Sequence, residues 1–154
     1  MGTQWSVRLA APPAAVGVPE LRIEIEAVLE TVNAQMSTYR EDALITRFNR
    51  ADAGESFTLP PDFARVLLDS LELARDSAGA FDPTVGPLVN LWGFGPEGDR
   101  TEPPPEAEIA AARARVGWER LDYDPSATRL TQPGGAYLDF SSIAKGHGVD
   151  RIAG

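Results

Sequence analysis

The segment LDFSSIAKGHGVD (residues 138–150) places a carboxylate, two small residues and a lysine in an order that suits anion binding. A strand is predicted to end at Asp139, and Ser141 and Ser142 lead into a helix with Lys145 in its first turn. Free backbone N–H groups at a helix N-terminus attract phosphate, and a lysine adds a compact positive charge. The glycine spacing does not fit a Walker A loop. A solvated surface lysine in the first turn of a helix is the more ordinary interpretation, and both stay open.

The run GAFDPTVGPLVNLWGFG (residues 79–95) is the second unusual stretch. Asp82 is its one charged residue, and four glycines, two prolines and three aromatic residues leave it without a clear helical or strand period. Glycines allow the backbone to approach a ligand closely, and Phe81 and Trp92 offer planar faces. The run fits two structures, a buried irregular loop that fills the core and a wall against a flat aromatic ligand.

Three further residues are weaker candidates. Tyr39 lies among polar residues in MSTYRED, which is typical of a tyrosine at the rim of a pocket or on the surface. Met1 belongs to a short MGT segment that alone indicates only the start of a strand. His147 could act as a general base, but it stands between two glycines with no identifiable acid partner, so a structural or exposed histidine is favoured.

Composition excludes several classes of protein. The chain has 154 residues, enough for one domain, and its 14 Lys and Arg against 23 Asp and Glu give a net charge of −9, which argues against nucleic-acid binding. With no cysteine and one histidine, disulfides, iron–sulfur clusters and multi-histidine metal sites are excluded. Any bound metal is therefore expected to be a hard, oxygen-liganded ion such as Mg²⁺. No apolar run reaches about 18 residues, so no membrane-spanning helix is expected.

The elements around these segments alternate between helical and strand patterns. Apolar periodicity predicts helices over residues 20–34, around 44–48, over 61–77 and 106–114, and from 144 onward. Ser37 or Thr38 is expected to cap the second helix, and Gly79 to end the third. Alternating patterns predict strands over residues 3–9, 118–124, 128–132 and 136–143, and residues 51–63 read as a loop. This predicts an α+β fold with an antiparallel sheet flanked by helices.

Taken in order, four segments give the chain a specific resemblance. MGT, MSTYREDALITRFNR, GAFDPTVGPLVNLWGFG and LDFSSIAKGHGVDRIA resemble the ApbE family over the whole of residues 1–154. These flavin transferases, also called FAD:protein FMN transferases, were formerly described as thiamine biosynthesis lipoproteins. The resemblance implies an α/β architecture called a T-fold.

The resemblance implies chemistry on FAD. Members of the family bind FAD with Mg²⁺, cleave its pyrophosphate, and transfer FMN to a Thr or Ser hydroxyl of a target flavoprotein with release of AMP. Because the nucleophile is that hydroxyl or water, no catalytic residue is expected in this chain. The motifs imply FAD contacts at Met1, Tyr39, Ala80, Phe81, Asp82, Asp139 and Lys145, and a main-chain oxygen ligand to the metal from Ser142. The remainder of the long run, through Trp92 and Phe94, is expected to pack behind the contacting residues.

The last motif departs from the family pattern. Relatives typically have DLGGIAKG followed by an aromatic residue, whereas this chain has DFSSIAKG followed by His147. Ser141 and Ser142 keep the pair small, which preserves the carbonyl ligand. The residue at the position of His147 normally packs, so the contact made by His147 is left open.

The length of the chain departs further from the family pattern than the last motif does. Family domains are about twice as long, and their second half carries a further glycine-rich segment and an Asp…Thr motif with the side-chain metal ligands. We therefore expect residues 1–154 to be the N-terminal portion of one incomplete T-fold domain. We expect it to have little or no transferase activity alone, and to associate with the missing half or with itself.

Two other functions share these motifs. An FAD pyrophosphatase would release FMN and AMP without an acceptor protein, and an inactive flavin-binding half-domain would do no chemistry. The compartment also stays open, because relatives are often exported lipoproteins, whereas the first residues lack the basic and apolar segments of a signal peptide.

Overall fold

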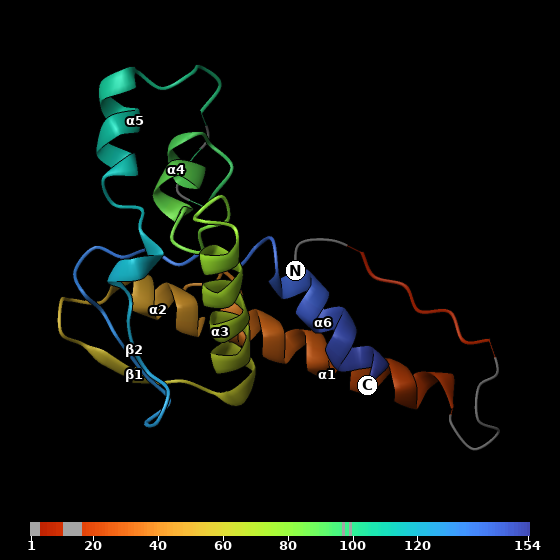
Figure 1. Ribbon diagram of the computed structural model, residues 1–154. Helices are drawn as coiled ribbons and strands as arrows, with labels where there is room; N and C mark the ends of the chain where they lie inside the picture. Colours follow the sequence, from red (N-terminus) through yellow and green to blue (C-terminus); the bar gives the residue numbers. More distant parts are fainter. Residues whose placement is uncertain (1–3, 11–16, 97, 99) are drawn as a thin grey trace.

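The computed structural model describes residues 4–10, 17–96, 98 and 100–154, which form helices around a small sheet (Figure 1). The helices are α1 (Val18–Met36), α2 (Leu44–Arg50), α3 (Pro61–Asp76), α4 (Gly86–Leu91), α5 (Glu106–Arg113), the 3₁₀ turn η1 (Trp118–Arg120) and α6 (Ala144–Ala153). The strands are β1 (Ser56–Thr58), β2 (Asp122–Asp124) and β3 (Arg129–Thr131). Within these residues, no helix has the length and apolar character needed to cross a bilayer.

The three strands form an antiparallel sheet in the order β1-β3-β2. Leu130 of β3 lies opposite Phe57 on one side and Tyr123 on the other. Phe57 and Leu130 are buried, while the strand residues on either side of Phe57 are exposed, so the sheet has one face toward the core. The α+β class and the antiparallel sheet flanked by helices are confirmed.

The core lies between α1, α2, α3 and this face of the sheet. Two edge-to-face aromatic pairs connect its elements: Phe48 with Phe57, with ring centroids 5.8 Å apart, and Phe63 with Phe140, at 5.3 Å. In Figure 1, α6 lies against α1 at one end of the molecule, and α4 packs against α5 at the other.

The predicted strand over residues 136–143 is wrong. Residues 136–140 are buried but belong to no strand. Their backbone groups are bonded instead to side chains and to a loop: Leu138 pairs with the carboxamide of Asn49, and the Asp139 N–H donates to the Pro83 carbonyl at 2.8 Å. The burial and hydrophobicity of residues 136–140 resemble those of a strand, but no strand among the described residues pairs with them.

Several other boundaries differ from expectation. The predicted strand over residues 3–9 is not formed in its described part, where Trp5, Val7 and Leu9 are exposed, because no described strand pairs with it. The segment expected to be a loop contains β1, and η1 replaces the first part of the strand predicted from residue 118.

The expected cap of the second helix is also wrong. Neither Ser37 nor Thr38 caps α2, which begins only at Leu44 with Ala43 as its uncapped N-cap residue. Thr38 is buried and lies in the connection between α1 and α2, where its hydroxyl cannot serve a helix that starts six positions later.

The end of α3 follows the Schellman pattern. The N–H of Gly79 donates to the Ala74 carbonyl at 2.8 Å, and the N–H of Ala78 donates to the Arg75 carbonyl at 3.1 Å. The prediction that Gly79 ends the helix is wrong: the C-cap is Ser77, and the left-handed residue that follows it is Ala78, with φ of 51°, before Gly79, with φ of 81°. The position that most favours glycine is therefore occupied by alanine.

Candidate functional site

A cavity of about 740 Å³ lies where the end of α1, the α4 region and the start of α6 meet. Its apolar lining comes from Val32, Met36, Val85, Val89, Phe94 and Ala144, and its polar lining from Asn33, Ser37, Thr38, Tyr39, Asp139, Ser141, Ser142 and Lys145. Four residues that the motifs predicted as site residues therefore share one cavity: Tyr39, Asp139, Ser142 and Lys145. An apolar wall facing hydroxyls and two opposite charges suits a ligand with both a flat ring and an anionic group.

The turn between Asp139 and Lys145 is internally bonded. The Asp139 Oδ1 accepts the Ser141 N–H at 2.7 Å, and the Lys145 Nζ donates to the Ser141 carbonyl at 2.5 Å. Asp139 is only 8% exposed, whereas Lys145 is exposed at the cavity. In the described part of the chain, the backbone N–H groups of Lys145 and Gly146 have no hydrogen-bond partner. The start of α6 therefore offers free donors and a positive charge to an anion in this cavity.

Tyr39 lies at the mouth of the cavity. Its hydroxyl donates to the Phe94 carbonyl at 3.0 Å, which joins the segment after α1 to the segment after α4. Both side chains are largely exposed, Tyr39 by 68% and Phe94 by 76%. Two exposed aromatic rings beside a cavity provide surfaces on which a planar ligand could stack.

Three of the other predicted contacts lie elsewhere. Ala80, Phe81 and Asp82 are on the loop before α4 and do not line this cavity. The Asp82 carboxylate accepts hydrogen bonds from the Thr84 hydroxyl at 2.6 Å and the Trp118 N–H at 3.2 Å, so it fastens the loop to η1. Met1 lies outside the described residues. These four contacts stay predictions.

The later part of the long run lines the cavity instead. Val85 and Val89 lie one helical turn apart and present the same side of the α4 segment to the cavity, and Phe94 follows them. The run had been expected to touch ligand only through its first residues, with the rest packed behind. The sequence pattern does not predict helix α4, because the helix has only six residues and the glycines and prolines of the run obscure its helical period.

His147 lies beside an acidic residue of α3, although its buried Nε2 makes no hydrogen bond to any described residue. Its Nε2 lies 3.4 Å from the Asp62 Oδ1 on α3, and the Arg151 Nε lies 3.3 Å from the same oxygen. The imidazole is only 13% exposed and does not line the cavity, so it joins α6 to α3. The sequence could not reveal this pair because Asp62 is distant along the chain.

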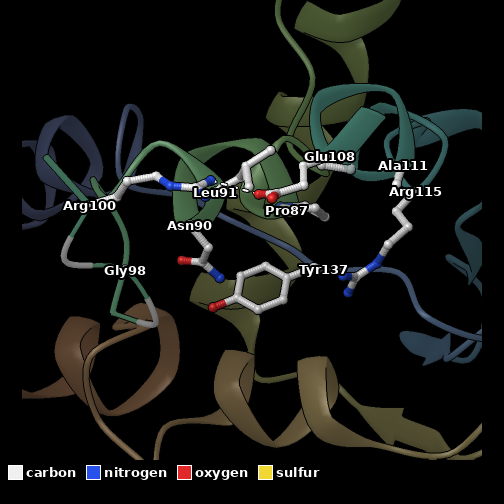
Figure 2. A pocket seen from close by; sticks show the side chains of 10 residues that line it. Pro87, Asn90, Leu91, Gly98, Arg100, Glu108, Ala111, Arg115 and Tyr137 are labelled. Carbon is white, nitrogen blue, oxygen red and sulfur yellow. Dashed lines mark hydrogen bonds and ion pairs between the residues drawn. The ribbon is translucent and has the colours of Figure 1, made fainter. Parts of the chain in front are cut away.

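A second cavity, of about 590 Å³, lies between α4 and α5 (Figure 2). Tyr137 and Asn90 face it, and an ion pair between Arg100 and Glu108, 2.7 Å apart, lies beside it. Arg115 also points toward this space. None of the residues predicted from the motifs lines it.

Comparison with known proteins agrees with the motifs. The family model described as "ApbE family" matches residues 1–154. The chain belongs to the ApbE family. A Vibrio cholerae protein named FAD:protein FMN transferase is 40% identical over 153 residues, which cover 99% of this chain and 46% of the relative.

Solved ApbE structures have the same fold. The flavin transferase ApbE from Vibrio cholerae has a TM-score of 0.87 at 41% identity and covers 93% of this chain. The apo flavinyl transferase ApbE from Pseudomonas stutzeri has a TM-score of 0.82 at 40% identity and covers 90% of this chain. Each alignment spans 46% of the solved chain. This ApbE chain therefore spans about half the length of the relatives that it matches.

The donor set for a metal is incomplete in this ApbE chain. Among the described residues, no group of three or more His, Cys, Asp or Glu side chains could hold an ion. Asp139 is one carboxylate whose Oδ1 already accepts a hydrogen bond, and Ser142 could add a carbonyl. Magnesium prefers six oxygen ligands, so these residues do not form a magnesium site by themselves.

Proposed function

We propose that this chain is the N-terminal portion of an FAD:protein FMN transferase and forms one wall of its FAD site. The reaction would move FMN from FAD to a Thr or Ser hydroxyl of a target flavoprotein and release AMP. The observation that carries the proposal is the cavity that gathers Tyr39, Asp139, Ser142 and Lys145 from separate segments. The names of relatives up to 41% identical support the same activity.

In this proposal the polar side of the cavity receives the pyrophosphate. Substitution at phosphorus depends on positioning and on neutralising charge on the phosphoryl oxygens. Lys145 and the free N–H groups at the start of α6 would hold a phosphate group. Asp139 lies next to them and would orient the ligand through its free oxygen.

The aromatic side of the cavity would receive a ring of FAD. Tyr39 and Phe94 are exposed at the mouth and are joined by a hydrogen bond, so they present a pair of ring surfaces. Phe81 is proposed to contact the ligand from the neighbouring loop, together with Ala80 and Asp82. Met1 is proposed as a further contact.

We also propose that the reaction depends on Mg²⁺, with the Ser142 carbonyl as one ligand. The described residues do not complete such a site, so the other ligands would come from the part of the relatives that this chain does not span. For the same reason the 154-residue chain should have little or no activity alone, and should need the complementary half or another copy.

The test is an assay with FAD, Mg²⁺ and a Thr-containing acceptor peptide. We expect almost no AMP from the chain alone, and AMP with flavinylated peptide when the complementary portion of a relative is added. Robust turnover by the isolated chain would refute the half-domain proposal. FMN and AMP in equal amounts with unmodified peptide would identify a pyrophosphatase. Flavin binding without either product in both mixtures would identify a binding module.

A further inference from the structure

Helix α2 lies between the two segments that carry Tyr39 and Asp139. Its apolar residues Ile45 and Phe48 are buried in the core. Thr46 and Asn49 are three positions apart and therefore project from neighbouring positions of the helix surface. Each makes a hydrogen bond to the backbone of a segment that lines the cavity.

Asn49 holds the Asp139 segment. Its Nδ2 donates to the Leu138 carbonyl at 2.9 Å, and its Oδ1 accepts the Leu138 N–H at 2.7 Å. This exchange of two bonds is what a hydrogen-bonded partner in an antiparallel strand would supply. Leu138, the residue before Asp139, is fully buried and belongs to no strand. The Asn49 carboxamide therefore takes the place of a neighbouring strand at Leu138.

Thr46 holds the Tyr39 segment. Its hydroxyl donates to the Ser37 carbonyl at 3.2 Å, and its side chain is almost completely buried. Ser37 lines the cavity two residues before Tyr39. One short helix thus bonds to two segments that both line the cavity.

We propose that Thr46 and Asn49 are positioning residues, which fix the Tyr39 segment relative to the Asp139 segment and so set the geometry of the FAD site. The inference rests on the proposed function for the identity of the ligand. Neither residue lines the cavity, so both would act through the backbone that they hold.

Single substitutions that remove these bonds, and one control on α3, test the proposal. Asn49→Asp keeps the acceptor and loses the donor. Gln132→Glu makes the same change in a buried carboxamide that bonds Phe48 of α2 to Ala136, two residues before Leu138, so it loosens the same contact and serves as a second positioning variant. Thr46→Val removes the hydroxyl without changing the shape, and Ser70→Ala removes a buried hydroxyl that bonds only within α3.

Thermal unfolding and FAD affinity of the chain, measured by flavin fluorescence, separate positioning from stability. We expect Thr46→Val to lose about as much thermal stability as Ser70→Ala, while Asn49→Asp, Gln132→Glu and Thr46→Val weaken FAD binding by about tenfold and Ser70→Ala does not. Adding Asn49→Asp to Asp139→Asn should cost little more affinity than Asp139→Asn alone. Equal loss of FAD affinity in Thr46→Val and Ser70→Ala, or additive loss of affinity in the double variant, would overturn the proposal. Thr46→Val keeps the test decisive if Asn49→Asp does not fold.

Backbone NMR separates failure of this inference from failure of the proposed function. Without ligand, Asn49→Asp should shift the amide signal of Ser141, and Thr46→Val should shift that of Tyr39. If these signals move but the wild-type chain does not bind FAD, the FAD assignment fails and the positioning role stands. If the signals do not move, the positioning role is wrong whatever the chain binds.

Discussion

Asp139 and Lys145 are the two charged residues among the described residues that line the 740 Å³ cavity, which is called the main cavity below. Both side chains are hydrogen-bonded to the backbone of Ser141. Their charges are opposite, so the cavity itself has no excess of positive charge. Binding of a pyrophosphate would therefore depend on where the positive charge and the free N–H groups lie within the cavity. Such local placement can bind an anion even though the whole chain has a negative net charge.

Lys145 provides the first residue-scale prediction. Lys145→Gln should weaken FAD binding roughly tenfold, because it removes a charged donor to phosphate. Thermal stability should change by less than about 0.5 kcal/mol, since the side chain is exposed. Arg151→Gln removes a positive charge from the same helix but on the side that faces Asp62, so it is the matched control. Equal loss of FAD affinity in both variants would show that only overall charge matters.

Asp124 provides a prediction about pH. A hydrogen bond from the Ser126 hydroxyl, followed by bonds from the backbone N–H groups of Ala127 and Ser126, holds the pKa of this carboxyl below its ordinary value of 3.8. Because the folded pKa is the lower one, this group stabilises the fold above the unfolded value. That stabilisation is lost as the pH falls through the folded pKa. NMR titration of Ser126→Ala should give a higher Asp124 pKa than wild type; an unchanged pKa would contradict the assigned cause.

At the scale of elements, Ala78 tests the Schellman end of α3. The Cβ of alanine is sterically strained in the left-handed conformation, and glycine has no Cβ. Ala78→Gly should therefore stabilise the chain by about 0.5–1 kcal/mol. The matched control is Ala114→Gly, because Ala114 ends α5 at a φ of −62° and glycine gains nothing there. Urea unfolding of both variants measures the difference. Destabilisation by Ala78→Gly would show that the α3 terminus is not as described.

Gly86 tests how α4 is placed on the segment that leads to Asp139. A Cβ on this glycine would lie 2.6 Å from the Tyr137 Cε1, so Gly86→Ala must displace α4 or the ring. We expect a loss of about 1–3 kcal/mol of stability, typical of overpacking. Gly146→Ala is the control, because its Cβ would meet nothing within 4 Å. Equal stability of the two variants would contradict the close approach of α4 to Tyr137.

Much of this arrangement could be predicted from the sequence, and the exceptions have physical causes. The long helices α1 and α3 follow from apolar periodicity, and Asp139 with Lys145 was found because a turn and a helix start are local features. The segment around Leu138 was mistaken for a strand because its partner is a side chain on a distant helix, which no local pattern records. The wall formed by Val85, Val89 and Phe94 was missed because α4 is too short to show a period.

At the scale of the whole molecule, the chain spans about half the length of its relatives, and its described residues do not complete a metal site. We therefore expect the affinity of the chain alone for FAD to be weaker than that of a complete transferase.

Mapping FAD binding on the chain by backbone NMR tests the central claim most directly. Titration with FAD should shift the amide signals of Tyr39, Asp139, Ser142 and Lys145, while the signals of Tyr137 and Arg115 beside the second cavity stay in place. Shifts confined to the second cavity, or no shifts at millimolar FAD, would contradict the assignment of the main cavity as the FAD site.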